Sequence, residues 1–208
     1  MMRTIQRDFR SETVIEKSRF ICTLKKVASE EEALRFIKEV KKEFWDATHN
    51  CSAYVTDGTA QRSSDDGEPA GTAGVPMLEV LRKNQLTGVA VVVTRYFGGV
   101  KLGAGGLVRA YSGSVASALR QCGLAEKVKV LRQSFTCAAD AAGRILNILY
   151  RQELFAVAEV DYGETVRITL QLRETDAART AAWLQDNLNM QLELTEAGSF
   201  YEEQPLKM

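Results

Sequence analysis

Three basic side chains flank or lie within a glycine-rich segment near the middle of the chain. Arg95 precedes the segment, Lys101 lies inside it and Arg109 follows it. A helix is predicted to begin around Ala104, and the first amide groups of a helix have no partners within the helix. These amide groups and the three cations could together bind an anion such as a phosphate. The alternative is a tight corner between a strand and a helix, with the cations in solvent.

The glycine-rich segment, residues 98–106, concentrates backbone freedom in a short stretch. Five of its nine residues are glycines. Glycine adopts positive φ angles and lets a ligand or another backbone approach closely, at a cost in chain entropy. We therefore predict a phosphate- or nucleic-acid-binding site here. It comprises Arg95, Gly98, Gly99, Lys101, Gly103, Gly105, Gly106 and Arg109.

A second polar segment, residues 57–74, contains three carboxylates close together and is predicted to be a long loop. Asp65, Asp66 and Glu68 could bind Mg²⁺ or position a water molecule for hydrolysis, because hard cations prefer carboxylate oxygens. The alternative is an acidic loop in solvent whose side chains cap turns and the next helix, a role that also suits Thr72. Long loops inside compact domains are often functional. The second part of the candidate site is therefore Asp65, Asp66, Gly67, Glu68, Gly71 and Thr72, with no metal or cofactor assigned.

His49 and Cys51 form a third candidate, because two residues apart on a strand their side chains would face the same side. A cysteine beside a histidine can serve as a nucleophile. A single histidine and a small buried cysteine are more often structural, however. No catalytic residue is therefore assigned, and the chain is expected to act without catalysis more readily than as an enzyme.

Hydrophobic periodicity predicts the elements that position these segments. The nearly continuous apolar run from Gly88 to Phe97 predicts a strand covered on both faces. Ser29 and Glu32 form a capping box for a helix that continues to Phe44. The remaining elements of the first half are strands over residues 13–27 and 51–56, a short helix from Pro76 and a helix over residues 104–119.

The pattern restarts around residues 123–127, which predicts one domain over residues 1–124 and a second over residues 125–208. In the second domain the order is strand, helix, strand, strand, helix, strand, which predicts a ferredoxin-like βαββαβ sandwich. The strands are expected at 128–137, 154–160, 165–172 and 190–195, and the helices at 139–152 and 175–189. Residues 199–208 are predicted to form a polar tail.

Composition limits the classes of function. The chain has 208 residues, 45% hydrophobic and 26% charged, which is enough to bury a substantial core. Its 27 basic and 27 acidic residues balance, so nucleic-acid binding would depend on a local patch. Four widely spaced cysteines without a C-x-x-C pair predict reduced, mostly buried thiols of a cytoplasmic protein. No apolar run approaches the length of a membrane span, so no membrane partner is predicted.

Two motifs of this sequence resemble those of one protein family. They are DDGEPAGTAG at residues 65–74 and TRYFGGVKLG at residues 94–103, in this order and with a helix and a strand between them. Both closely resemble motifs of the YigZ/IMPACT family. Ser18-Arg19-Phe20 and His49-Asn50-Cys51 also look like that family's N-terminal domain, and the resemblance extends over residues 10–205.

The resemblance implies an α+β fold with two different domains. The first would be a β/α fold similar to the second domain of a small-subunit ribosomal protein and to a domain of elongation factor G, with a left-handed β-α-β crossover. The second would be the ferredoxin-like domain typical of bacterial members. A role in translation is implied as well, because eukaryotic relatives regulate initiation by competing for an activator of a stress kinase. They do so with an additional N-terminal domain, so that partner is not expected for this chain.

Three functions stay open on these grounds. The first is binding of RNA or the ribosome through the glycine-rich segment, with Tyr96 and Phe97 stacking on bases if they are exposed. The second is a Mg²⁺-dependent enzyme that acts on a phosphorylated small molecule. The third is a regulator that binds a protein partner and performs no chemistry. We expect the first, as a regulator of translation initiation.

Overall fold

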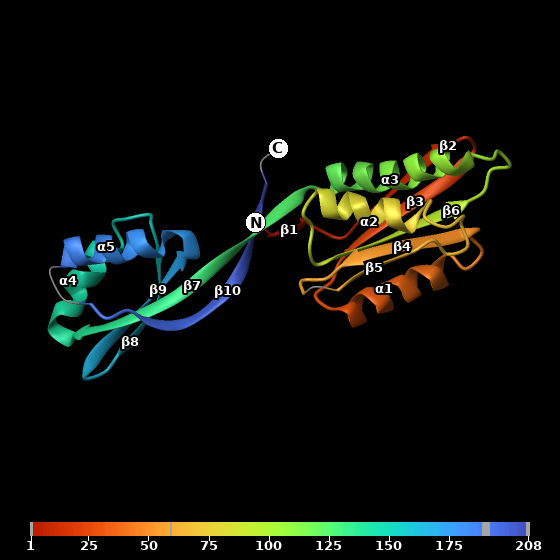
Figure 1. The fold of residues 1–208 in the computed structure, drawn as a ribbon. Coiled ribbons are helices and arrows are strands. Elements are labelled where there is room, and N and C mark those ends of the chain that lie inside the picture. Colours follow the sequence, from red (N-terminus) through yellow and green to blue (C-terminus); the bar gives the residue numbers. More distant parts are fainter. Residues whose placement is uncertain (1, 59, 189–191, 207–208) are drawn as a thin grey trace. The chain divides into compact units, whose positions relative to one another are not determined.

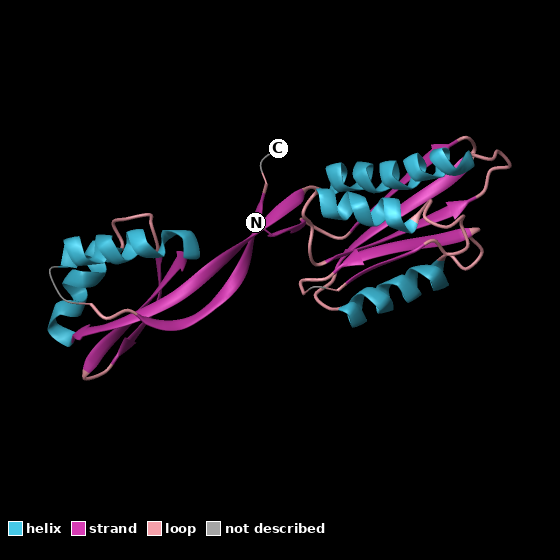
Figure 2. Ribbon diagram, in the orientation of Figure 1, coloured by secondary structure: helices cyan, strands magenta, loops and turns pink. Residues whose placement is uncertain are grey.

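The computed structural model of the chain describes residues 2–58, 60–188 and 192–206. The fold is mixed α+β, with helices packed on two sheets (Figure 2). Contacts divide the chain into two compact units, one of residues 1–127 with 203–208 and one of residues 128–202. None of the helices in the described ranges is long and apolar enough to cross a membrane.

Unit 1 is built on a five-stranded sheet in the order β2-β3-β6-β4-β5, with antiparallel neighbours. Helix α1 covers one face of this sheet, and helices α2 and α3 cover the other (Figure 1). The strands are β2 (Phe9–Ile15), β3 (Ser18–Lys26), β4 (His49–Val55), β5 (Gln61–Ser64) and β6 (Val89–Tyr96). The helices are α1 (Glu30–Glu43), α2 (Gly74–Lys83) and α3 (Gly103–Cys122).

Strand β6 lies at the centre of this sheet and is buried on both faces, as its apolar run predicts. Val91 and Val93 belong to the core under α2 and α3, whereas Ala90 and Val92 belong to the core under α1. The predicted capping box of α1 is also present, because the Ser29 hydroxyl accepts a hydrogen bond from the Glu32 amide. Arg95 lies near the end of β6, and the glycine-rich segment follows this strand directly.

The predicted loop over residues 57–74 differs from the observed structure. Residues 61–64 form β5, an edge strand paired with β4, and α2 begins at Gly74. The sequence of β5, QRSS, is polar throughout and all four residues are exposed. It therefore shows no alternation of apolar and polar residues from which a strand could be predicted.

Unit 2 has the predicted βαββαβ order. Its strands lie in the order β10-β7-β9-β8, and core residues of β7, β9, α4 and α5 form one cluster. The strands are β7 (Leu124–Ala138), β8 (Ala156–Tyr162), β9 (Thr165–Arg173) and β10 (Thr195–Pro205). The helices are α4 (Ala139–Leu149), a 3-10 turn (Glu174–Asp176) and α5 (Ala177–Leu188). This is the ferredoxin-like arrangement.

The end of the chain corrects two predictions. The strand predicted at 190–195 lies partly outside the described residues, and residues 192–194 are not in a strand. The predicted polar tail at 199–208 is wrong for residues 199–205, which belong to β10 and pair with β7. Ten of the eleven residues of β10 are exposed, so its sequence carries no buried face that would predict a strand.

Strand β1 (Met2–Ile5) is also absent from the sequence-based prediction. It pairs antiparallel with residues 124–127 of β7, and Ile5 is fully buried in the core of unit 1. Thr4 and Ile5 are both buried, but Ile5 is the one apolar side chain of β1 in this core, so four residues with one buried apolar position form too short a pattern to predict a strand.

Candidate functional site

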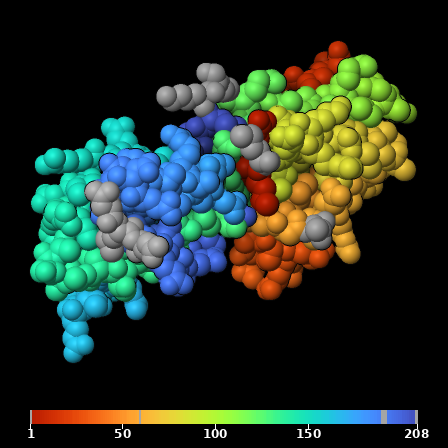
Figure 3. All heavy atoms as spheres, turned by 60° about the vertical axis from the view of Figure 1, so that its left-hand side comes forward, coloured from red at the N-terminus to blue at the C-terminus, as the bar shows by residue number. Residues whose placement is uncertain are grey.

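The two segments singled out in the sequence meet at one end of unit 1. The loop from β6 to α3 and the loop from β5 to α2 are neighbours there, in yellow-green and gold (Figure 3). Both loops line a single pocket of about 290 Å³. We call it the motif pocket; its lining residues are Glu68, Pro69, Arg95, Phe97, Lys101, Leu102, Gly103, Ala104 and Leu107.

A buried ion pair forms the inner wall of the motif pocket. Arg95 Nη1 on β6 donates to Oε1 of Glu68 at 2.7 Å, and the two side chains are only 6% and 3% exposed. The Tyr111 hydroxyl on α3 donates to the same oxygen at 2.8 Å. His49 Nε2 on β4 lies 3.8 Å from the other oxygen, Oε2. Three elements of unit 1 thus converge on one carboxylate.

Arg95 therefore does not have the surface position in which it would contact a phosphate. Its guanidinium lies between the rings of Phe20 and Phe97, 5.5 and 5.4 Å from their centroids. A buried charge needs a partner of opposite sign, and Glu68 supplies it. Arg95 thus holds the loop before α2 against β6.

Asp65 caps helix α2. Its carboxylate accepts hydrogen bonds from the amides of Gly71, Ala73 and Gly74 at 2.8, 3.0 and 2.8 Å. Burial alone would raise the pKa of Asp65, but these amides outweigh burial and hold the pKa below its usual value. The expected helix cap is thus confirmed for Asp65, whereas Thr72 is not the cap. Its hydroxyl donates to the Pro69 carbonyl instead.

Asp66 ties the same loop to α1 and β4. Its two oxygens accept from Lys41 Nζ and from the Asn50 amide, both at 2.6 Å. Burial would raise the pKa of Asp66, but the hydrogen bonds from Lys41 and Asn50 outweigh burial and lower it. Among the residues described by the structure, no group of three or more His, Cys, Asp or Glu side chains is placed to hold a metal ion.

Lys101 and Arg109 are the exposed cations of the predicted site. Neither makes an ion pair with another residue in the described part of the chain. Both line a second depression of about 440 Å³ beside the start of α3, where Glu16 is the carboxylate on the wall. No side chain caps the N-terminus of α3, and its partial positive charge adds to the two cations. Lys101 lines this depression and the motif pocket alike.

The glycines of the site have different structural roles. At Gly98 a Cβ would lie 2.0 Å from the Lys17 carbonyl oxygen, so glycine is needed for close packing against the β2–β3 turn. Gly99 and Gly103 have φ angles of +85° and +69°, which favour glycine. Gly105 and Gly106 lie in the first turn of α3. In the other loop, Gly67 and Gly71 also have positive φ angles.

His49 and Cys51 share one face of β4, as predicted, and each contacts the loop before α2. His49 Nδ1 lies 2.9 Å from the Asp66 carbonyl oxygen, and Cys51 Sγ donates to the Asp65 carbonyl at 2.9 Å. Burial raises the pKa of the Cys51 thiol to about 12. A thiol with that pKa is not a nucleophile at neutral pH, so both residues position the loop.

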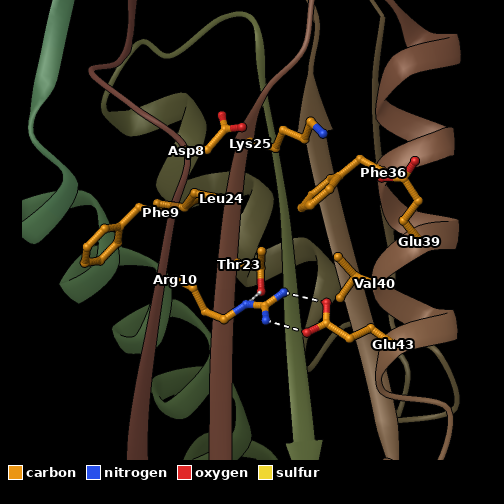
Figure 4. Close-up of a pocket in the computed structure, with 10 residues that line it drawn as sticks. All are labelled: Asp8, Phe9, Arg10, Thr23, Leu24, Lys25, Phe36, Glu39, Val40 and Glu43. Atoms are coloured by element: carbon orange, nitrogen blue, oxygen red, sulfur yellow. Dashed lines mark hydrogen bonds and ion pairs between the residues drawn. The ribbon is translucent and has the colours of Figure 1, made fainter.

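Another depression of unit 1 lies on the opposite face of the sheet, between α1 and strands β2 and β3 (Figure 4). Its central cation is Arg10, which forms a bidentate pair with Glu43 at 2.5 and 2.7 Å and also donates to the Thr23 hydroxyl. This guanidinium is thus fully engaged, and Lys25, which lies near the Phe36 ring, is the other cation that lines the depression.

Comparison with known proteins places these features in a family. The family model described as the Impact N-terminal domain matches residues 16–119, and a model of a domain of unknown function matches residues 140–189. The IMPACT family member YvyE of Bacillus subtilis is 45% identical over 95% of this chain and 92% of its own length. The chain belongs to the IMPACT family. Every residue that bounds the motif pocket lies within the matched IMPACT domain.

Two further relatives of this IMPACT-family chain show how far the likeness extends. The IMPACT family member YigZ of Escherichia coli is 44% identical over 59% of this chain and 62% of its own length. A solved structure titled as that of a hypothetical protein is 35% identical, with a TM-score of 0.59 over 92% of this chain and 95% of that one. The likeness to that structure therefore extends over most of both units.

Proposed function

We propose that this IMPACT-family protein is a cytoplasmic regulator of translation that binds RNA, including ribosomal RNA, through Lys101, Arg109 and the start of α3. The observation that carries the proposal is the pair of exposed cations beside an uncapped helix N-terminus. Lysine and arginine side chains and helix amides are the groups that bind phosphates of a nucleic-acid backbone. The role in translation is the one that the family resemblance implies.

Phe97 adds a second feature expected of an RNA-binding site. Its side chain is 46% exposed and lies at the mouth of the motif pocket, beside Lys101. An exposed aromatic ring next to a cation is the arrangement on which unpaired bases stack. Because the chain carries no net charge, such binding would depend on this local patch rather than on the charge of the whole molecule.

A Mg²⁺-dependent enzyme is less well supported by the contacts in the loop before α2. The oxygens of Asp65 accept from amides of α2 and its preceding turn, and those of Asp66 accept from Lys41 and Asn50. Glu68 is engaged by Arg95 and Tyr111. Both oxygens of Asp65 and of Asp66 are thus engaged by protein donors, and so is Oε1 of Glu68.

The test is binding of the purified chain to ribosomes and to total cellular RNA at low salt. We expect co-sedimentation with ribosomes, and loss of bound partners from a lysate pull-down after ribonuclease treatment. Absence of binding to both ribosomes and RNA at low salt would overturn the proposal. Partners that survive ribonuclease, together with no RNA binding, would instead identify a regulator that acts through protein contacts.

A further inference from the structure

One acceptor atom that faces the motif pocket receives no hydrogen bond from the described residues. Oε1 of Glu68 accepts from both Arg95 and Tyr111, but Oε2 accepts a hydrogen bond from none of the residues that the structure describes. Its nearest charged neighbour is His49 Nε2 at 3.8 Å, which is beyond hydrogen-bond distance. The Glu68 side chain is only 3% exposed, and it lines the pocket. Because Oε2 is open to the pocket rather than fully enclosed, a ligand with an N–H group could donate a hydrogen bond to it.

The walls and rim of the motif pocket suit a flat, uncharged group that is attached to an anion. Pro69, Phe97 and Leu107 provide the apolar surface. At the rim, Lys101 and the start of α3 are positive, so they attract a negative charge. A ligand that fits all three features carries an N–H donor at its inner end and a phosphate at its outer end.

We infer that the motif pocket binds one unpaired nucleobase of single-stranded RNA, and that the base presents an exocyclic amino group to Oε2 of Glu68. Adenine, cytosine and guanine carry such a group, and uracil does not. This inference rests on the proposed function and adds to it a preference among bases. The phosphate of the same nucleotide lies at Lys101, between the motif pocket and the depression beside Arg109. A base paired in a duplex cannot enter, because its amino edge is already used.

The Glu68 carboxylate also lowers the affinity for bases that lack the amino group. Uracil presents carbonyl oxygens where cytosine presents its amino group, and an oxygen facing a carboxylate oxygen is repelled. A purine base without the 6-amino group leaves Oε2 without a donor, as in the free protein. A hydrogen bond to a charged group accounts for a preference of about tenfold or more.

The experiment varies the ligand and leaves the protein intact. Affinities of the full chain are measured by fluorescence anisotropy for four short oligoribonucleotides of equal length, made of adenosine, of purine riboside, of cytidine or of uridine. We expect the adenosine oligomer to bind about tenfold tighter than the purine riboside oligomer, and cytidine about tenfold tighter than uridine. Adenosine 5′-monophosphate is included, and we expect it to bind more weakly than the oligomer because it has one phosphate.

Each other outcome has a definite meaning. Equal affinity for all four oligomers would overturn the base-recognition inference and leave the proposed RNA binding intact. No binding of any oligomer would overturn both. Binding of the mononucleotide as tightly as the oligomer would overturn RNA as the source of the base and indicate a free nucleotide.

Two variants locate the base preference in the pocket. Ala104→Trp, at the exposed start of α3, blocks the pocket without altering Glu68, and we expect it to abolish the preference. Gln121→Trp places the same bulk on the last turn of the same helix and should leave the preference unchanged. Glu68→Gln, if it stays folded by circular dichroism, should bring the cytidine-to-uridine ratio toward one. A base preference that survives Ala104→Trp would contradict this location.

Discussion

Arg95 Nη1 and Glu68 Oε1 lie 2.7 Å apart in the interior of unit 1, and this ion pair connects the end of β6 to the loop before α2. Through Glu68 the pair also engages Tyr111 on α3. The two motifs of the sequence, residues 65–74 and 94–103, are therefore held together by charge as well as by packing. This connection gives the motif pocket its fixed inner wall.

Breaking this pair should destabilise unit 1 strongly. Arg95→Met leaves the Glu68 carboxylate buried without its cation, and we expect a loss of about 3–5 kcal/mol in the free energy of unfolding. The double variant Arg95→Met/Glu68→Met removes both charges, so it should be more stable than Arg95→Met alone. Urea denaturation of the natural protein, Arg95→Met, Glu68→Met and the double variant measures this coupling. A loss in the double variant equal to the sum of the two single-variant losses would mean that the pair is not coupled in solution.

Asp65 should stabilise the start of α2 in a pH-dependent way. Asp65→Ala removes the acceptor of three amides, and we expect a loss of about 1–2 kcal/mol at neutral pH. The pKa of Asp65 is lowered in the folded protein, so its contribution is complete above the unfolded pKa of about 3.9 and disappears as the pH falls through the folded value. Denaturation midpoints from about pH 7 to about pH 2 should therefore converge for the two proteins at the acid end. A difference that stays constant with pH would show that the carboxylate charge is not involved.

Gly98 and Gly105 should respond oppositely to the same substitution. A Cβ at Gly98 would lie 2.0 Å from the Lys17 carbonyl oxygen, so Gly98→Ala should cost about 1–3 kcal/mol by forcing the backbones apart. At Gly105 the nearest atom to a Cβ is Arg109 Nη1, at 3.6 Å. Gly105→Ala should be neutral or should stabilise α3 by up to about 1 kcal/mol. Thermal unfolding of both variants gives the comparison, and a tolerated Gly98→Ala would contradict the observed packing.

The sequence predicted the elements of this protein where apolar residues repeat with a clear period. Strand β6 and helix α3 are examples, because Val91 and Val92 are buried on opposite faces and Leu107, Tyr111 and Val115 form a buried stripe. The sequence did not predict the strands β1, β5 and β10, which are short or are edge strands with exposed side chains. For such strands, backbone pairing with a neighbour determines the structure, and the side chains carry little signal.

The sequence singled out the two loops but did not predict that they line one pocket or which contacts they make there. Both loops line one pocket, yet the sequence could not show that Arg95 would be neutralised by Glu68, since the two residues are 27 positions apart. Tyr111 was not among the predicted site residues. A buried tyrosine hydroxyl generally has a hydrogen-bond partner, and this general rule was the one available signal for its contact with Glu68.

The salt dependence of RNA binding tests the central claim most directly, because the claim assigns phosphate contacts to Lys101 and Arg109. The affinity of a single-stranded oligoribonucleotide is measured over a range of salt concentrations for the natural protein and for Lys101→Gln/Arg109→Gln. Both residues are exposed, so the substitutions should change stability by no more than about 0.5 kcal/mol. Each lost phosphate contact should reduce the slope of log K against log salt by about 0.7. We predict a slope shallower by about 1.4 in the double variant, with weaker binding at low salt; identical slopes and affinities for the two proteins would contradict the claim.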